Sequence, residues 1–313
     1  MATTTTTTPA PGAPSSPPHT KAKVLVLNAT GKAGRNVCRA LKDAGYDVYG
    51  TSRSPANAAL TAAGVTPVAA NYTVRADLDR AFATTGAKKV FVQTDFFAAA
   101  EKSAAREVEQ GKAAIDAAEA AGVDHLVFMS VADAECFDPH TLHLHAKVEL
   151  EAYLRSRPGL RYSIVRPCAF FENLDDAANW NPLKKGVVKF MSTQDCKYCS
   201  TYDIGRAAAA MFDDPATWLG KSLDVISWQG DLEALAAALS RVSGVPVKAK
   251  LAMPLWARRL FFKDLHHMFL YYEVEKGPKG KPEDFKKVVP GAMSAEDWFR
   301  FHGRYANGER ICE

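Results

Sequence analysis

The chain has 313 residues, of which 47% are hydrophobic and 24% are charged, and its formal net charge is +4. This composition suits a globular α/β enzyme-sized domain with a smaller appended part, and the mild charge excludes the strongly basic footprint of nucleic-acid binding. No uninterrupted apolar run approaches the roughly 20 residues that a membrane-spanning helix needs, so no membrane contact is expected.

Residues 1–20 consist mainly of threonine, proline, alanine and serine and contain no acidic residue, lysine or arginine. Such a segment buries too little apolar surface to offset its ordering entropy, so we expect a disordered tail. Six scattered cysteines favour a reducing, cytoplasmic location. A plastid transit peptide is the alternative interpretation of the tail, since hydroxylated residues and the lack of acids fit one.

Residues 21–53 have the pattern of strand, glycine turn, helix and second strand. Residues 23–27 are a short apolar run typical of a strand buried on both faces, and residues 46–51 form the next strand. Between these two strands, apolar residues recur at helical spacing, and Gly45 marks the end of this expected helix. The pattern predicts the first βαβ unit of a dinucleotide-binding sheet.

The turn between the first strand and the helix carries the phosphate-binding signal. Gly31 lacks a Cβ and lets the backbone approach phosphates, while Gly34 lets the helix pack closely on the first strand. Asn28 replaces the usual first glycine, and asparagine readily adopts left-handed backbone angles. The expected cofactor-binding residues of the turn are Asn28, Thr30, Gly31, Lys32, Ala33 and Gly34.

The end of the second strand selects between cofactors. A site for NAD needs a carboxylate there to hold the ribose 2′-hydroxyl. This chain has Thr51, Ser52, Arg53 and Ser54 instead. Arg53 offers a planar charged fork to a 2′-phosphate, and Lys32 can add a second charge. The sequence therefore predicts NADP(H) as the cofactor.

Strand and helix patterns continue to alternate as far as residue 170. We expect strands at 65–70, 88–94, 125–130 and 162–167, and helices at 76–85, 101–121 and 145–156. The alternation predicts a doubly wound Rossmann-type parallel sheet, an α/β fold, with its ligands at the carboxyl ends of the strands. Residues 21–170 are thus expected to form the NADP-binding domain.

The alternation breaks after residue 170, so residues 171–313 are expected to form a smaller α/β substrate or lid part, interleaved with the sheet. Helical patterns cover residues 173–180, 201–212, 231–242, 256–273 and 294–302, and residues 276–287 read as a basic loop. An aromatic stripe at helical spacing is expected to belong to the core rather than to a flavin site; its residues are Trp256, Phe261, Phe262, Leu265, Phe269 and Tyr272.

The chain resembles the NmrA-like branch of the short-chain dehydrogenase/reductase superfamily over almost its whole length after the tail. The resemblance rests on the turn at residues 28–34, Arg53, and the groups of residues 110–112, 121–123, 147–154, 166–173, 203–205 and 295–302. The family includes NADPH-sensing regulators of transcription and stress signalling, and NADPH-dependent reductases of quinones or aromatic compounds. The resemblance implies a cofactor-binding protein of one of these kinds.

The resemblance also implies roles for residues beyond the turn. Thr94, Asp95 and Phe96 are expected to flank the cofactor, and Lys147 to reach its nicotinamide ribose. The nicotinamide side is expected to be lined by Phe170, Phe171, Glu172 and Asn173. Asn71 stands after the third strand, near the expected adenine position, where the family usually has Gly-Asp.

The catalytic pattern of the superfamily is incomplete here. Working reductases use Tyr-x-x-x-Lys, in which the lysine lowers the pKa of the tyrosine so that it can protonate a carbonyl while a serine holds the oxygen. This chain has Lys147 and Ser130, but His143 stands in the tyrosine position. His143 could donate the proton; alternatively it only adjoins a bound cofactor.

Two functions therefore remain open from the sequence. One is an NADP(H)-responsive redox sensor without catalysis, which acts on a regulatory protein partner; the other is an NADPH-dependent reductase of a quinone or another small conjugated carbonyl. We expect a monomer or a homodimer. No metal is expected, because Cys196 and Cys199 lack a second ligand pair, and no carboxylate or cysteine completes a set around His140, His143 and His145.

Overall fold

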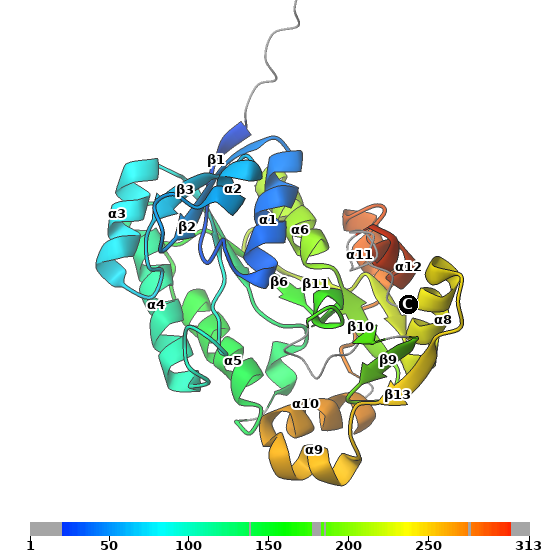
Figure 1. The fold of residues 1–313 in the computed structure, drawn as a ribbon. Helices are drawn as coiled ribbons and strands as arrows, with labels where there is room; N and C mark the ends of the chain where they lie inside the picture. Colours follow the sequence, from blue (N-terminus) through cyan, green and yellow to red (C-terminus); the bar gives the residue numbers. More distant parts are fainter. Residues whose placement is uncertain (1–20, 138, 177–182, 185, 275–276, 302–313) are drawn as a thin grey trace, which may run out of the picture.

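The computed structural model describes residues 21–137, 139–176, 183–184, 186–274 and 277–301 (Figure 1). The expected tail, residues 1–20, lies outside the described residues. Within the described part of the chain, no helix is long and apolar enough to cross a membrane.

A seven-stranded parallel sheet forms the centre of the molecule, in the order β3-β2-β1-β4-β5-β6-β11 (Figure 1). Its strands are β1 (Lys21–Val26), β2 (Tyr46–Ser52), β3 (Thr66–Ala69), β4 (Lys89–Val92), β5 (His125–Met129), β6 (Tyr162–Pro167) and β11 (Ser222–Val225). The order reverses between β1 and β4, which places a ligand crevice at the carboxyl ends of these two strands. The predicted α/β fold is confirmed, and β11 shows that residues beyond 170 complete the sheet.

Helices cover both faces of the sheet (Figure 1). One face carries α1 (Lys32–Asp43) and α6 (Thr201–Asp213), and the other carries α3 (Arg75–Thr85), α4 (Ala104–Ala120) and α5 (Leu142–Arg155). The short helices α2 (Ala58–Ala62) and α7 (Pro215–Trp218) precede β3 and β11.

Two glycines allow the helices of each layer to approach closely. A Cβ on Gly205 of α6 would lie 2.6 Å from the Cβ of Ala40 on α1, and one on Gly111 of α4 would lie 2.5 Å from Leu150 on α5. Both glycines belong to groups of residues that carry the family resemblance. Glycine is therefore required at both positions because the neighbouring helices pack too closely to admit a side chain.

The remaining residues form a smaller part beside the carboxyl edge of the sheet (Figure 1). Its strands, in two three-stranded sheets, are β7 (Ala169–Phe170), β8 (Leu183–Lys184), β9 (Val187–Phe190), β10 (Cys196–Cys199), β12 (Trp228–Gly230) and β13 (Lys248–Leu251). Its helices are α8 (Leu232–Ser243), α9 (Leu255–Phe261), α10 (Lys263–Val274), α11 (Pro282–Val288) and α12 (Ala295–Phe301). An aromatic core that includes Phe171, Tyr198 and Trp298 fills its interior.

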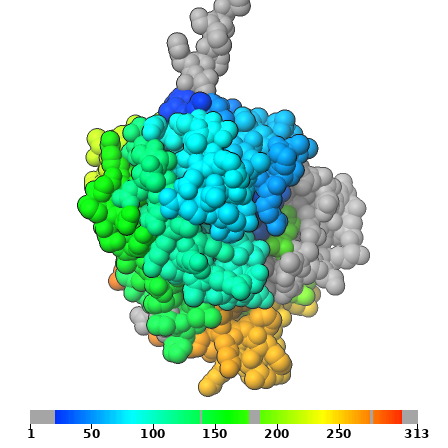
Figure 2. Space-filling view, turned by 90° about the vertical axis from the view of Figure 1, so that its left-hand side faces the viewer, coloured from blue at the N-terminus to red at the C-terminus, as the bar shows by residue number. Residues whose placement is uncertain are grey.

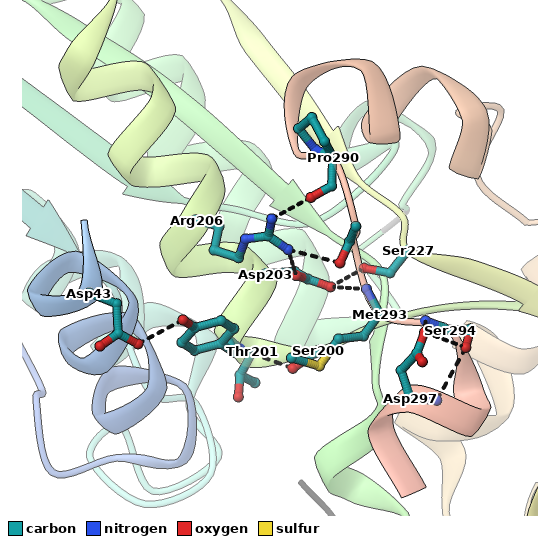
Figure 3. Close-up of polar contacts among 12 residues, drawn as sticks. Asp43, Ser200, Thr201, Asp203, Arg206, Ser227, Pro290, Met293, Ser294 and Asp297 are labelled. Atoms are coloured by element: carbon teal, nitrogen blue, oxygen red, sulfur yellow. Dashed lines mark hydrogen bonds and ion pairs between the residues drawn. The ribbon is translucent and has the colours of Figure 1, made fainter. Parts of the chain in front are cut away.

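A buried carboxylate fastens the two parts together (Figure 3). Asp203 on α6 accepts hydrogen bonds from the Ser227 hydroxyl at 2.8 Å and the Met293 backbone N–H at 2.9 Å, and it pairs with Arg206 at 3.2 Å. Burial raises the pKa of Asp203 despite these bonds. The link positions the chain just before α12, where Ser294 and Asp297 cap the start of the helix with reciprocal hydrogen bonds.

Three sequence predictions in the second half of the chain are wrong. Residues 256–273 form two helices that meet at Phe262 rather than one, and the expected loop at 276–287 contains α11. The expected helix at 173–180 is a 3-10 turn that ends at Asn173, and its residues 177–180 lie outside the described part.

The expected aromatic core stripe is only half correct. Phe269 and Tyr272 are buried, but Trp256 and Phe261 are 66% and 68% exposed. The break at Phe262 turns α9 away from the core, so its apolar residues face outward. Figure 2 shows this segment projecting from the lower end of the molecule.

Candidate functional site

The turn after β1 has the backbone that the sequence predicts. Asn28 has a φ of 54°, in the left-handed region. Its N–H donates to the Thr51 hydroxyl at 2.9 Å, and Gln93 donates from Nε2 to its carbonyl at 3.1 Å. A Cβ on Gly34 would lie 2.1 Å from the same carbonyl. No other residue type fits at Gly34 unless the turn or the helix moves.

The start of α1 is arranged to receive an anion. Gly31 is the N-cap residue and supplies no side-chain cap, and the first turn of the helix has no acidic residue. The N–H groups of this turn lack partners within the helix, and the helix dipole favours a negative charge in front of them. Ala33 is buried beneath this turn. The geometry suits a phosphate group beside Thr30 and Gly31.

Lys32 does not lie beside Arg53, although the sequence predicts that it adds a second positive charge there. Its ammonium lies 2.7 Å from Asp176 Oδ2 and 2.9 Å from Asn173 Oδ1. Asn173 ends the 3-10 turn at the start of the smaller part, and Asp176 follows it. Lys32 therefore connects the glycine turn to that part instead of adding a charge beside Arg53.

A pocket of about 300 Å³ lies along the carboxyl ends of β1 to β3 and the segment after β4. Its lining includes Asn28, Thr30, Arg53, Asn71 and Asp95, which are five of the predicted site residues. Among the described residues, none forms an ion pair with the exposed Arg53. The pocket thus offers a free guanidinium beside the glycine turn.

The pocket also contains a buried hydroxyl without a partner. The Tyr72 side chain is 9% exposed, and its hydroxyl has no hydrogen-bond partner among the described residues. Burial and the nearby Asp95 raise the pKa of Tyr72, and Arg53 lowers it in part. An unpaired buried hydroxyl costs free energy. Arg53 and Tyr72 in the lining, together with the close backbone approach at Gly34, fit a phosphorylated dinucleotide.

Lys147 is held in a buried cluster. Its ammonium lies 2.6 Å from Glu107 Oε1 and also contacts the Thr94 hydroxyl, and Thr94 itself donates to Glu107 Oε1 at 2.6 Å. The side chains of Lys147 and Glu107 are 9% and 1% exposed. Lys147 is thus neutralised by a carboxylate rather than left free beside a proton donor.

His143 lies one helical turn before Lys147 and has a carboxylate partner of its own. Its Nδ1 contacts Asp264 Oδ2 on α10. Its ring centroid lies 5.9 Å from that of the buried Phe96 and 5.7 Å from that of the exposed Phe97. The contact with Asp264 joins the helix that carries Lys147 to the projecting α9–α10 pair.

Ser130, the other expected catalytic residue, follows the end of β5. Its neighbours are not those of Lys147. Its side chain is buried near Glu151. Burial opposes ionisation of Glu151, yet the bonds from Arg166, with help from Ser130, lower the pKa of this carboxyl overall. Arg166 and Glu151 pair at 2.6 Å. Ser130 is thus buried near this ion pair, and its hydroxyl oxygen has no hydrogen-bond partner among the described residues.

The residues expected to line the nicotinamide side differ in their burial and in their contacts. Phe171 is fully buried in the aromatic core, with its ring 5.4 Å from that of Tyr198, so it cannot line an open site. Glu172 Oε1 accepts from Thr201 N–H at 3.0 Å and from the Ser200 hydroxyl at 3.1 Å, which caps α6. Phe170 remains half-buried beside the sheet. Packing therefore overrides the expected role of Phe171.

Three important residues were missed by sequence reasoning: Gln93, Tyr72 and Glu107. Glu107 carried a readable signal, because it falls on the apolar face of α4 with Gly111 and Ile115. An acid on a buried helix face requires a cationic partner. Gln93 and Tyr72 gave no such signal, since their contacts come from segments distant in the chain.

Solved structures with the same fold include nicotinamide-dinucleotide complexes. The negative transcriptional regulator NmrA in complex with NAD has a TM-score of 0.74 and 20% identity, over 94% of this chain and all (100%) of that one. The NADPH-dependent quinone oxidoreductase from Escherichia coli, complexed with NADPH, has a TM-score of 0.67 and 23% identity, over 88% of this chain and 97% of that one. These likenesses establish the fold.

The sequence comparisons establish the family. A reductase of Streptomyces griseus that acts on (4-alkanoyl-5-oxo-2,5-dihydrofuran-3-yl)methyl phosphate is 34% identical over 168 residues, which are 53% of this chain and 54% of the reductase. The match thus spans about half the length of that relative. The profile of the NmrA-like family matches residues 20–298. The chain belongs to the NmrA-like family.

Proposed function

We propose that this protein binds NADP(H) and acts as a redox sensor that regulates a partner protein. The observation that carries the proposal is Arg53, an unpaired guanidinium in the pocket beside the glycine turn. A guanidinium there suits the 2′-phosphate that distinguishes NADP from NAD. The pyrophosphate would lie at the start of α1, and Tyr72 and Asn71 would border the adenosine end.

The proposal of a sensor rests on the polar contacts that connect the glycine turn and α1 to other segments. Lys32 links the glycine turn to Asp176, and Asn36 on α1 donates to the Thr201 hydroxyl on α6 at 2.6 Å. The contact of Lys32 with Asp176 joins the turn to the start of the smaller part, and the contact of Asn36 with Thr201 joins α1 to α6. A ligand shifts such an equilibrium only when it binds one state better than the other.

The state of Lys147 also supports a sensor. Glu107 neutralises its ammonium, and the tyrosine whose pKa such a lysine lowers is replaced by His143. When bound, the cofactor supplies a hydride to an acceptor, but this chain offers no tyrosine to protonate the product. The similarity to NmrA, a transcriptional regulator, agrees with this proposal.

A second candidate function is reduction of a quinone or another small conjugated carbonyl. It is favoured by the pair of His143 and Asp264, because a carboxylate at Nδ1 orients an imidazole for proton donation from Nε2. The E. coli quinone oxidoreductase of the same fold agrees with this alternative.

One experiment separates the two functions. NADPH affinity and quinone-dependent NADPH oxidation are measured for the wild type, His143→Ala and His143→Tyr. A sensor binds NADPH with similar affinity in all three proteins and shows negligible turnover in the wild type. Strong wild-type turnover rejects the sensor; a loss of about 10²–10⁴-fold in His143→Ala then assigns His143 as the acid.

A further inference from the structure

A second, larger pocket of about 550 Å³ lies in the smaller part of the molecule. It shares no lining residue with the pocket around Arg53. Its walls come from β10, β12 and the segment at residues 277–286, which includes the basic stretch noted in the sequence. Its volume lies within the range of about 300–1,000 Å³ that is usual for small-molecule sites.

A buried lysine forms the base of this pocket. Lys197 is 7% exposed, and its ammonium donates to the carbonyls of Pro278 and of Gly280, the latter at 2.7 Å. Lysine is rarely buried to this degree without a paired charge. An ammonium has three donors, and two carbonyls satisfy two of them. The site therefore retains a positive charge and donor capacity.

The loop above Lys197 is fixed in place and is itself basic. The Lys279 backbone N–H donates to Asp133 Oδ2 at 3.1 Å, and the same carboxylate oxygen accepts from the Tyr271 hydroxyl at 2.7 Å. Asp133 lies four residues after the end of β5 at Met129, so the segment after this strand of the central sheet holds the loop. A loop anchored at both its backbone N–H and carbonyl groups presents its side chains in a defined arrangement.

The lining of the pocket carries an excess of positive charge. Lys279, Lys281 and Lys286 join Lys197 in the lining, while Glu283 is the acidic lining residue. None of the four lysines forms an ion pair with a described residue, whereas Lys287 next to them pairs with Asp284 at 2.7 Å. Like charges gathered around one cavity repel one another, and an anion in the cavity would remove this repulsion.

An aromatic ring borders the basic cavity. Trp228 lines it and is packed against the core, with its ring 5.8 Å from that of Tyr198 and 6.1 Å from that of Phe171. Gly230 makes room for the ring, because a Cβ there would lie 2.3 Å from it. The indole is thus held in position and can report on occupancy through its fluorescence.

We propose that this pocket binds a small soluble molecule that carries a pyrophosphate group. Lysine ammonium groups bind phosphoryl oxygens as point charges, and four of them match a ligand with several negative charges. The fixed carbonyl contacts of Lys197 make it the central anchor, and the exposed lysines form the rim. The site is separate from the dinucleotide pocket and does not depend on the proposed sensor function.

The test uses inorganic pyrophosphate as the probe, with the full-length protein. Calorimetry measures its affinity for the wild type, Lys197→Met, Lys286→Ala and Lys287→Ala. We expect a loss of about tenfold or more for Lys197→Met and about threefold or more for Lys286→Ala. Lys287→Ala is the matched control, because Lys287 is paired outside the pocket, and its affinity should equal that of the wild type.

Two further readouts make the outcome decisive. Pyrophosphate should change the tryptophan fluorescence of the wild type, and Trp228→Phe should abolish this change while calorimetry still detects binding. Lys286→Ala keeps the loop anchors, so it remains informative if Lys197→Met fails to fold. Absence of binding overturns the proposal. Binding that Lys286→Ala and Lys197→Met leave unchanged also overturns it and assigns the anion to the glycine turn.

Discussion

The ammonium of Lys147 lies 2.6 Å from a carboxylate oxygen of Glu107, and both side chains are almost fully buried. Oε2 of Glu107 has no hydrogen-bond partner among the described residues. The lysine that defines the catalytic pattern of the superfamily thus also compensates a charge inside the fold. Its loss has a structural consequence that is separate from any effect on a cofactor.

We predict that Lys147→Met destabilises the protein by about 3–5 kcal/mol at neutral pH, because it leaves the Glu107 charge buried and unpaired. The double variant Glu107→Gln/Lys147→Met should recover most of this loss. Urea unfolding of the wild type, both single variants and the double variant measures the coupling. Additive single effects would show that the two residues do not act as a pair.

The glycine turn gives a second prediction. Gly34→Ala should destabilise the fold by about 3 kcal/mol and weaken dinucleotide binding, because the added Cβ would lie 2.1 Å from the Asn28 carbonyl. Gly31→Ala is the control, since its nearest contact, 3.1 Å away, is the Asn28 side chain, which can move. Chemical denaturation compares the two variants. Equal losses would contradict the close-packing role assigned to Gly34.

A third prediction concerns pH. Burial, reinforced by the nearby Lys89, lowers the pKa of His125 from 6.5 to about 4. The unfolded chain therefore binds a proton on this residue between these pH values and the folded protein does not, so stability falls as the pH decreases from 6.5 to 4. The contribution of His125 is about 3 kcal/mol. It is fully present above pH 6.5.

The matched variant for this prediction is His125→Gln, which keeps a polar side chain beside the Ser163 hydroxyl, 2.7 Å from the imidazole Nε2. The free energy of unfolding is measured between pH 4 and pH 7 for both proteins. The variant should show a flatter pH dependence in this window. An unchanged slope would mean that another group carries the acid sensitivity.

The sequence predicts the fold well where a local pattern determines the element. The strand expected at residues 162–167 is β6 without a shift, and the left-handed backbone expected at Asn28 is present. The local pattern does not predict the end of a helix when helical periodicity continues into the next helix, as at Phe262 between α9 and α10. Strands of two to four residues in the smaller part have too short a pattern to recognise.

The sequence could predict only those site residues that lie on the glycine turn or at the ends of strands. Arg53 and Asn28 line one pocket, as expected, because both follow neighbouring strands. The pairings of Lys147 with Glu107 and of His143 with Asp264 could not be predicted, since Glu107 and Asp264 come from α4 and α10, far away in the chain. The place of Glu107 on the buried face of α4 indicates that it needs a cationic partner, but not which one. Tertiary packing brings these pairs together, and no local motif encodes it.

Selection of NADP(H) by Arg53 is tested most directly by a titration of NADPH and NADH against the wild type, Arg53→Ala and Arg53→Asp. An arginine–phosphate contact contributes about 1.5–3 kcal/mol, so the wild type should prefer NADPH by about tenfold or more. Arg53→Ala should remove this preference while keeping NADH affinity, and Arg53→Asp should reverse it. Equal affinities of the wild type for both cofactors, or an NADPH preference that survives in Arg53→Ala, would contradict the selection of NADP(H) by Arg53.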